Sequence, residues 1–427
     1  MKSIVSVMSI IALGFGLLGC PGSGGGGGGG TAQETGFVYV ANSGSGSNTI
    51  SMFSVTPITG VLASVGTPVA AGTQPQQVIL DTAGQFAYTA NVGSADLSGY
   101  LINPNGALSS LGPAINVGTA PNPPTFDPLN RYLFVPNTGS DNLSVFGFNP
   151  STGGLSVVAG SPFPTGVNPQ SASIDLQGRF VWVNNLTAGT VSMFFINARG
   201  VLSVAAGSPL VTGISPQRVV FRQFGFKLFT FVANAGSGTV SVYEVNQTTG
   251  GVISPSLGSP FAAGISPSAV TLDPSGRFAL VANTGSNNVS VYIIDSTTGA
   301  LTVVQNPALP VTNFFSAGTA PQQVTIHPSG SFAYIANATS GDVSAYTINQ
   351  TTGVLTQIAS SPFPTGGTNP KRVTIDSAGK FAFVSNQNSD TIAVFAIDQT
   401  TGVLTAVIGS PFPTGDAPDQ ATTAGTF

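Results

Sequence analysis

The sequence is poor in the residue types that carry most enzyme chemistry. Its 427 residues include one cysteine, one histidine and one tryptophan, and only 6% are charged. A lone cysteine cannot form a disulfide within the chain, and one histidine with one cysteine cannot complete a zinc site of the usual ligands. We therefore expect no bound metal and no other cofactor.

Charged residues are few, and the net charge of the chain is small. Eleven lysines and arginines stand against fifteen aspartates and glutamates, for a net charge of −4. The cations occur singly or in pairs along the chain, so no basic stripe exists to neutralise phosphate groups. Nucleic acid is excluded as a partner on this ground.

Long apolar runs are also missing, except at the start of the chain. Lys2 precedes the apolar run of residues 4–18, and this order of a positive charge and a short apolar segment is typical of a secretion signal. We interpret residues 1–19 as a signal peptide.

The single cysteine closes the sequence LLGC at residues 17–20, which resembles a bacterial lipobox. Cys20 is then the lipidated residue, and the Gly-rich residues 20–36 form a flexible tether. The alternative is an ordinary cleaved signal with an incidental cysteine. Lipidation predicts an exported, membrane-anchored protein, periplasmic or at the cell surface. Pro21, in place of an inner-membrane-retaining aspartate, favours the outer membrane.

Past the tether the sequence repeats with a period of roughly 50 residues. A segment such as FVYVAN (37–42) or FAYIAN (332–337) recurs eight times and always ends in asparagine. The eight asparagines are Asn42, Asn91, Asn137, Asn185, Asn234, Asn283, Asn337 and Asn386.

Each unit contains four strand-like pieces, and this predicts an all-β propeller in a single domain at residues 37–427. Residues 267–278 (PSAVTLDPSGRF) are typical of an inner strand that ends in a hairpin turn. The first unit lacks such a strand, and residues 418–427 at the end of the chain match it. We predict eight four-stranded blades, with seven as the alternative, and a ring closed by the C-terminal strand pairing with the N-terminal blade.

The YVAN-type segment after a D-x-x-G-[RK]-F turn resembles the lactonase-like and YVTN-repeat propellers, which include bacterial 6-phosphogluconolactonase and a muconate-cyclising enzyme. The resemblance covers residues 37–427. It implies seven blades, and a site in which histidine, arginine and glutamate act as base and anion clamp. This chain has eight units, and none of the positions that begin an inner strand carries histidine or glutamate.

Ligands of propellers usually approach the mouth of the central channel, where the inner strands begin after a proline. The candidate ligand-binding residues there are Gln77, Gln170, Arg218, Gln323, Lys371, Arg372 and Asp419. Lys371 and Arg372 are expected to lie one blade from Asp419. They could form an ion pair with Asp419 or, alternatively, a binding site for an anion. His327 stands in the turn position that aspartate takes in most repeats. We expect His327 and the turn aspartates, such as Asp273, to be exposed to solvent on the opposite rim.

These observations support two main hypotheses. The first is a lipid-anchored, extracytoplasmic binding or protein-interaction module for an unknown small molecule, glycan or envelope protein. The second is a lactonase-like hydrolase with an atypical site at the channel mouth; whether the protein is an enzyme stays open, because the expected histidine and glutamate are absent. A repetitive surface protein without a small-molecule site is a third possibility.

Overall fold

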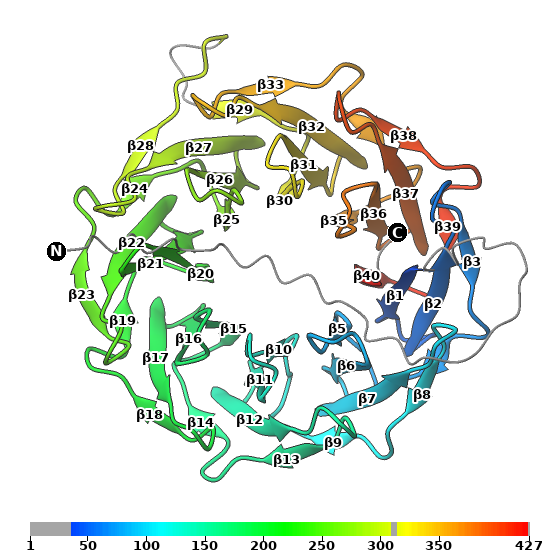
Figure 1. Ribbon diagram of the computed structural model, residues 1–427, viewed down its shortest axis with the longest axis horizontal. Coiled ribbons are helices and arrows are strands. Elements are labelled where there is room, and N and C mark those ends of the chain that lie inside the picture. Colours follow the sequence, from blue (N-terminus) through cyan, green and yellow to red (C-terminus); the bar gives the residue numbers. More distant parts are fainter. Residues whose placement is uncertain (1–35, 309–313, 426–427) are drawn as a thin grey trace, which may run out of the picture. The chain divides into compact units, whose positions relative to one another are not determined.

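The computed structural model describes residues 36–308 and 314–425, in which the chain forms the strands β1 to β40. They are arranged in eight sheets that stand like blades around a central channel (Figure 1). Nothing in the described ranges is a helix long and apolar enough to cross a bilayer. The predicted signal peptide and Cys20 lie outside the described residues.

Every blade repeats one order of strands, from the channel outward. The innermost strands of blades 1 to 8 are β40 (Pro418–Ala424), β5 (Ile79–Leu80), β10 (Thr125–Phe126), β15 (Pro169–Ile174), β20 (Pro216–Phe224), β25 (Pro267–Leu272), β30 (Pro321–Ile326) and β35 (Pro370–Ile375). The second strands are β1 (Gly36–Asn42), β6 (Phe86–Asn91), β11 (Tyr132–Asn137), β16 (Phe180–Asn185), β21 (Lys227–Asn234), β26 (Phe278–Asn283), β31 (Phe332–Asn337) and β36 (Phe381–Asn386). All eight end in the repeated asparagine.

The third strands run back in antiparallel pairing with the second. They are β2 (Thr49–Val55), β7 (Asp96–Ile102), β12 (Asn142–Phe148), β17 (Thr190–Ile196), β22 (Thr239–Val245), β27 (Asn288–Ile294), β32 (Asp342–Ile348) and β37 (Thr391–Ile397). The amide of the repeated asparagine donates to side chains of the third strand; Asn234 Nδ2, for example, lies 2.9 Å from Ser241 Oγ. The asparagine therefore fixes the end of the hairpin.

The outer strand of each blade is divided into two short pieces, where the sequence predicts one strand. The first pieces are β3 (Leu62–Ser64), β8 (Leu108–Ser110), β13 (Leu155–Val157), β18 (Leu202–Val204), β23 (Val252–Pro255), β28 (Leu301–Val303), β33 (Leu355–Gln357) and β38 (Leu404–Ala406). The second pieces are β4 (Val69–Ala70), β9 (Ile115–Asn116), β14 (Phe163–Pro164), β19 (Leu210–Val211), β24 (Phe261–Ala262), β29 (Phe314–Ser316), β34 (Phe363–Pro364) and β39 (Phe412–Pro413). Both pieces pair with the third strand, and a proline, which cannot donate to a ladder, stands between them.

The ring closes as the sequence predicts. β40 pairs with β1 in antiparallel register, with Ala424 opposite Phe37 and Ala421 opposite Val40. Thr422 Oγ1 also donates to the carbonyl of Val78 in blade 2, at 2.5 Å. The eight-bladed prediction and the closure by the C-terminal strand are both confirmed.

The hydrophobic core lies between the blades. Eight clusters of buried side chains each join two neighbouring sheets, so second strands such as β31 are buried on both faces. Aromatic side chains also reach across the seams: Trp182 Nε1 donates to Gly250 O at 3.1 Å, and the Tyr334 hydroxyl donates to Gly402 O at 2.8 Å. Neighbouring blades are therefore held together by both apolar contacts and hydrogen bonds.

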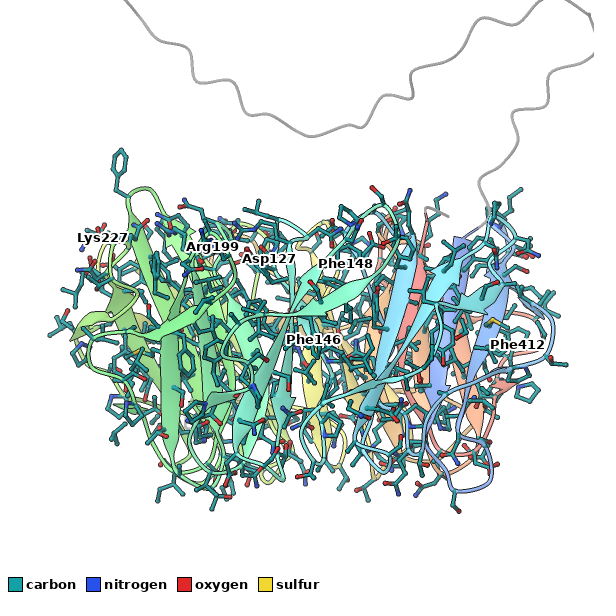
Figure 2. The ribbon with its side chains drawn as sticks, turned by 90° about the horizontal axis from the view of Figure 1, so that it is seen from below. Asp127, Phe146, Phe148, Arg199, Lys227 and Phe412 are labelled. Carbon is teal, nitrogen blue, oxygen red and sulfur yellow. The ribbon has the colours of Figure 1, made fainter. Side chains whose placement is uncertain are left out.

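The strands run between two faces of the ring (Figure 2). On the face that we call the mouth face, the inner strands begin after their prolines. On the other, the Gly36 face, the described chain begins at Gly36, and the hairpins between first and second strands turn; Asp127, Arg199 and Lys227 lie near this edge. The two faces carry different residues, and the arguments below depend on the distinction.

Two expectations about the hairpin turns of the Gly36 face are wrong. The turn aspartates, expected in solvent, are buried; Asp273 is 2% exposed, and its Oδ1 accepts the N–H of Phe278. His327 lies on this rim as predicted but is 3% exposed. Its Nε2 lies 2.9 Å from Gly379 O, and its Nδ1 2.8 Å from Ser329 Oγ. Turn N–H groups need acceptors, and this need draws the side chains inward.

Candidate functional site

The channel mouth is built by an irregularity that recurs in most of the inner strands. In blade 6, Pro267 pairs with Asn283, and the register then shifts before Ala269 pairs with Ala282. The same shift occurs after Pro169, Pro216, Pro321, Pro370 and Pro418. Such a bulge changes the direction of the side chains around it. The residues directly after each proline thereby become the rim and wall of the channel.

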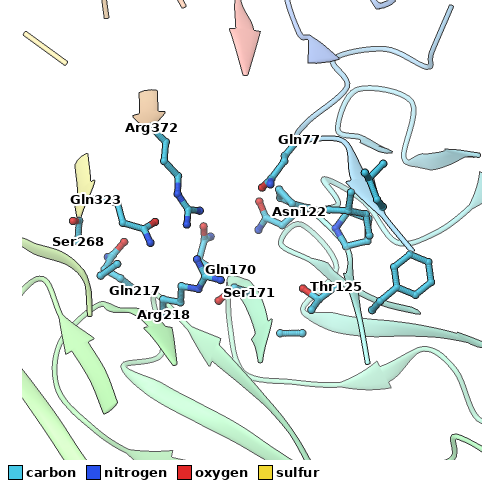
Figure 3. Close-up of a pocket in the computed structure, with 17 residues that line it drawn as sticks. Gln77, Asn122, Thr125, Gln170, Ser171, Gln217, Arg218, Ser268, Gln323 and Arg372 are labelled. Carbon is cyan, nitrogen blue, oxygen red and sulfur yellow. The ribbon is translucent and has the colours of Figure 1, made fainter. Parts of the chain in front are cut away.

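A cavity of about 600 Å³ occupies this mouth. Five of the predicted residues line it: Gln77, Gln170, Arg218, Gln323 and Arg372. Further polar groups come from Asn122, Ser171, Gln217 and Ser268, each of which is one of the two residues that follow the proline of an inner strand (Figure 3). The predicted Lys371 and Asp419 do not belong to the lining.

One side of the cavity is apolar, which the sequence reasoning missed. It is formed in blades 2 and 3 by Ile79, Leu80, Pro123, Pro124 and Phe126. Most of these residues lie deeper along the inner strand than the pair after the proline. A search that had included the fourth and fifth residues after each proline would have found three of them.

Arg218 and Arg372 dominate the electrostatics of the cavity. They come from β20 and β35, three blades apart, and extend toward the same space, with the amide of Gln170 beside them (Figure 3). Both side chains are at least partly accessible to solvent. The protein atoms around Arg218 nevertheless desolvate its guanidinium group, and this burial lowers the pKa of Arg218. Burial, and then the charge of Arg218, lower the pKa of Arg372 to about 10. Both remain cations at neutral pH.

No carboxylate neutralises this pair. Arg372 Nη1 donates to Gln420 Oε1 at 3.2 Å, and Arg218 makes no side-chain hydrogen bond or ion pair with any residue in the described ranges. The three ion pairs among the described residues all lie on the Gly36 face, between Arg131 and Asp127, Arg179 and Asp175, and Lys227 and Glu244. Two guanidinium groups that line one cavity without counter-charge form a site for an anion.

Asp419 lies beside the cavity, on the seam between blades 1 and 2. Burial raises the pKa of its carboxyl, against the lowering effects of the backbone N–H of Gln420, the charge of Lys371 and the backbone N–H of Gln77, whose side chain lines the cavity. Within the part of the chain that the structure describes, Asp419 and Lys371 form no ion pair closer than 4.0 Å. A carboxyl with a raised pKa at the edge of a polar cavity is suited to proton transfer.

The inner strands below the mouth are tied together by hydroxyl groups. Ser173, Thr271, Thr325, Thr374 and Thr422 each donate to a backbone carbonyl of the next inner strand. These bonds fix the spacing of the strands that carry Arg218, Gln323 and Arg372. The cavity wall is therefore held in place before any ligand arrives.

Among the residues that the structure describes, no histidine or glutamate lies in this region. His327 is on the Gly36 face, and Glu244 is paired with Lys227 on the same face. Across residues 36–308 and 314–425, no three His, Cys, Asp or Glu side chains come together as the ligands of a metal would. The chemistry of the mouth is that of two arginines, a ring of amides and one nearby carboxyl.

Comparison with known proteins relates this geometry to a family. The sequence pattern of the family described as "Lactonase, 7-bladed beta-propeller" matches residues 31–122, 164–363 and 323–415. No functionally characterised protein in the curated set was similar enough in sequence to count as a match.

Several solved structures have the same fold. The periplasmic gluconolactonase PpgL of Pseudomonas aeruginosa is similar with a TM-score of 0.60 and 18% identity, over 92% of this chain and 100% of that chain. A candidate 6-phosphogluconolactonase of Bacteroides fragilis gives 0.62 and 18%, over 93% and 99%. A protein of Lactobacillus plantarum gives 0.63 and 18%, over 92% and 100%. At this identity the likeness concerns the fold alone. The sequence match over most of the chain shows more: the protein belongs to the lactonase family of seven-bladed β-propellers, and its own ring has eight blades.

Proposed function

We propose that the protein is a lactonase-like hydrolase that opens a small lactone at the channel mouth. The observation that carries this proposal is the convergence of Arg218 and Arg372, without a counter-charge, in a cavity of about 600 Å³. Ring opening of a lactone develops negative charge on the carbonyl oxygen and yields a carboxylate. A fixed pair of guanidinium groups stabilises both.

The remaining step is the activation of water. Asp419 directly follows the proline of its inner strand, as the polar lining residues of other blades do, and its raised pKa makes it a stronger base than an ordinary aspartate. Asp419 accepts a proton from water as the water oxygen bonds to the carbonyl carbon. The tetrahedral oxyanion is held by the arginines, and its collapse breaks the bond to the ring oxygen. That oxygen takes up the proton and leaves as the alcohol of a hydroxy acid.

The test is acid release from a panel of sugar-derived and aliphatic lactones. Arg218→Gln and Arg372→Gln keep a polar side chain at each position and should lower kcat/KM by about 100-fold or more, the usual effect of removing an oxyanion contact. Asp419→Asn should lower kcat. The matched control is Arg199→Gln, an exposed cation on the Gly36 face, which should leave turnover unchanged. Turnover that survives all three site substitutions would overturn the proposal.

A second candidate function is binding of a hydroxycarboxylate without turnover. It is favoured by the absence of histidine and glutamate from the lining and by the position of Asp419 beside the cavity. Its sign is an increase in Tm on addition of gluconate or another hydroxy acid, lost in Arg218→Gln, with no lactone hydrolysed. If the protein neither hydrolyses a lactone nor binds a hydroxy acid, both candidate functions are excluded.

We further propose that the protein is exported and anchored to a membrane through a lipid on Cys20. The lipobox-like residues 17–20 and the Gly-rich residues that follow support this proposal. Mass spectrometry of the N-terminal peptide should show a chain that begins at an acylated Cys20. The Cys20→Ser variant should leave the membrane fraction, and an unmodified cysteine in the mature protein would contradict the proposal.

A further inference from the structure

We propose that the Gly36 face of blades 3 to 5 is a membrane-contacting surface for a bilayer with anionic headgroups. The partner is a lipid surface, and the contact is separate from the channel mouth on the opposite face. Three observations carry the inference: exposed apolar side chains, exposed cations, and the point at which the described chain begins.

The apolar side chains occupy the tips of three neighbouring hairpins. Leu129 lies between β10 and β11, Leu176 between β15 and β16, and Phe226 between β20 and β21; they are 53%, 68% and 99% exposed. The corresponding hairpin tips of blades 2, 6, 7 and 8 carry only Thr, Ala, Ser or Pro in these positions. Three large apolar groups at the outermost points of adjacent blades are suited to insertion between lipid headgroups.

Cations surround these tips. Seven of the ten lysines and arginines in the described ranges lie on the Gly36 face: Arg131, Arg179, Arg199, Arg222, Lys227, Arg277 and Lys380. Five of them belong to blades 3 to 5, and Arg199 and Lys227 lie along the edge seen in Figure 2. Three of these cations are ion-paired, with Asp127, Asp175 and Glu244, so five positive and three negative charges leave blades 3 to 5 with a net charge of +2 on this face. Exposed cations near a bilayer are attracted to anionic lipids.

The loops of the mouth face are acidic. Its loops outside the channel carry Asp96, Asp141, Asp342, Asp390 and Asp416 and, in the described ranges, no lysine or arginine. An anionic surface would repel these loops and attract blades 3 to 5 of the Gly36 face, whereas the exposed Asp295 and Asp398 of that face belong to blades 6 and 8, outside the proposed contact. The charge distribution therefore selects one orientation.

The start of the described chain agrees with that orientation. Gly36 is on the Gly36 face because Phe37 pairs with Ala424 at the end of β40, away from Pro418 at the mouth. Whatever precedes Gly36 thus joins the ring on the side that carries Phe226. With this face on the bilayer, the channel mouth opens away from the membrane, toward dissolved substrate.

The test is vesicle flotation with residues 34–427, which contain every strand and the ring closure and lack Cys20 and the apolar residues 4–18. Vesicles of phosphatidylglycerol and phosphatidylethanolamine should bring the ring to the lipid fraction, and high salt should weaken binding. Phosphatidylcholine vesicles should bind it much less. Phe226→Ser combined with Leu176→Ser should lower the partition coefficient by roughly tenfold or more.

Two matched variants distinguish binding through this surface from nonspecific binding to lipid. Ile265→Ser removes a 66% exposed aliphatic group from the mouth face and should leave binding unchanged. Arg199→Gln removes an exposed cation and should reduce binding to anionic vesicles only. The proposal is overturned if the ring does not bind anionic vesicles, or if Ile265→Ser weakens binding as much as the Phe226 variant. In the first case, exposed Leu129, Leu176 and Phe226 would point to a protein partner.

Discussion

Arg218 and Arg372 lie 154 positions apart in the sequence and three blades apart in the ring, yet their guanidinium groups share one cavity. Burial lowers the pKa of both side chains, and the charge of Arg218 lowers the pKa of Arg372 further. These shifts disfavour the charged forms of the two arginines in the folded protein. We infer that an anion bound between the two guanidinium groups would offset this effect.

The first prediction concerns stability. Arg218→Gln removes one of two like charges from the cavity and should raise Tm in the absence of ligand by about 1–3 °C. Differential scanning calorimetry measures the shift. Arg199→Gln, on the exposed Gly36 face, serves as the control and should leave Tm unchanged. A fall in Tm for Arg218→Gln would mean that Arg218 has a structural role.

The second prediction concerns pH. Because the pKa of Arg372 is about 10, below its ordinary value, binding of a hydroxycarboxylate should be constant through neutral pH and fall as the pH rises through 10. Calorimetric titration at several pH values measures it. The fall reflects loss of the proton from Arg372, so Arg372→Gln should bind weakly at every pH without this step. A wild-type affinity that stays constant beyond pH 10 would contradict the assignment.

Asp419 gives a third prediction, on stability and activity together. Its carboxyl has a raised pKa in the folded chain and an ordinary one when unfolded, so the folded state holds the proton more tightly. Stability should therefore be greatest below the ordinary pKa and decline as the pH rises to the raised value. Asp419→Asn should flatten this part of the stability curve and abolish the rise of lactone hydrolysis over the same pH range. An unaltered pH–rate profile would exclude Asp419 as the base.

The fourth prediction separates the only histidine from catalysis. His327→Asp restores the residue found at this turn in five other blades, and its carboxylate can accept the N–H of Phe332. The change also removes the contact with Gly379, so the free energy of unfolding should change by no more than about 1–2 kcal/mol. Lactone turnover should be unchanged, because the turn lies on the Gly36 face. A loss of turnover without a loss of stability would place the active site elsewhere.

The fifth prediction concerns the seam. Deleting residues 418–427 removes β40 and leaves an inner edge of β1 unpaired, so Tm should fall markedly. Thr422→Val removes only the hydroxyl bond to Val78 and should cost about 1 kcal/mol. Thr271→Val removes the same kind of bond within the continuous chain and should cost as much. If the deletion destabilises the protein no more than Thr422→Val does, the C-terminal strand does not close the ring.

Much of the fold could be predicted because each unit repeats its own hydrophobic pattern and turn signals. The eight segments that end in asparagine set the number of blades, and the match between residues 418–427 and the other inner strands identified the closing strand. The divided outer strand was not anticipated. Its short pieces, such as β13 and β14, have too few residues to show a period, and only the proline between them signals the break.

The site was harder to predict than the ring. Positions after a proline identified Arg218, Arg372 and three glutamines of the lining, because equivalent positions in a repeat occupy equivalent places around an axis. The sequence could not reveal that the two arginines reach one space across the channel, which depends on side-chain length and the radius of the ring. Nor could it reveal the burial of His327, which follows from the packing of one turn against Gly379 of the next blade.

The pairing of Phe37 with Ala424 brings the two ends of the ring side by side at one seam. A short linker between them would make the backbone circular, and new termini could then be placed in any of the other hairpin turns without removing a strand. Such circular permutants would show whether all seams are equivalent or whether the sheet shared by β1 and β40 is the place where unfolding starts.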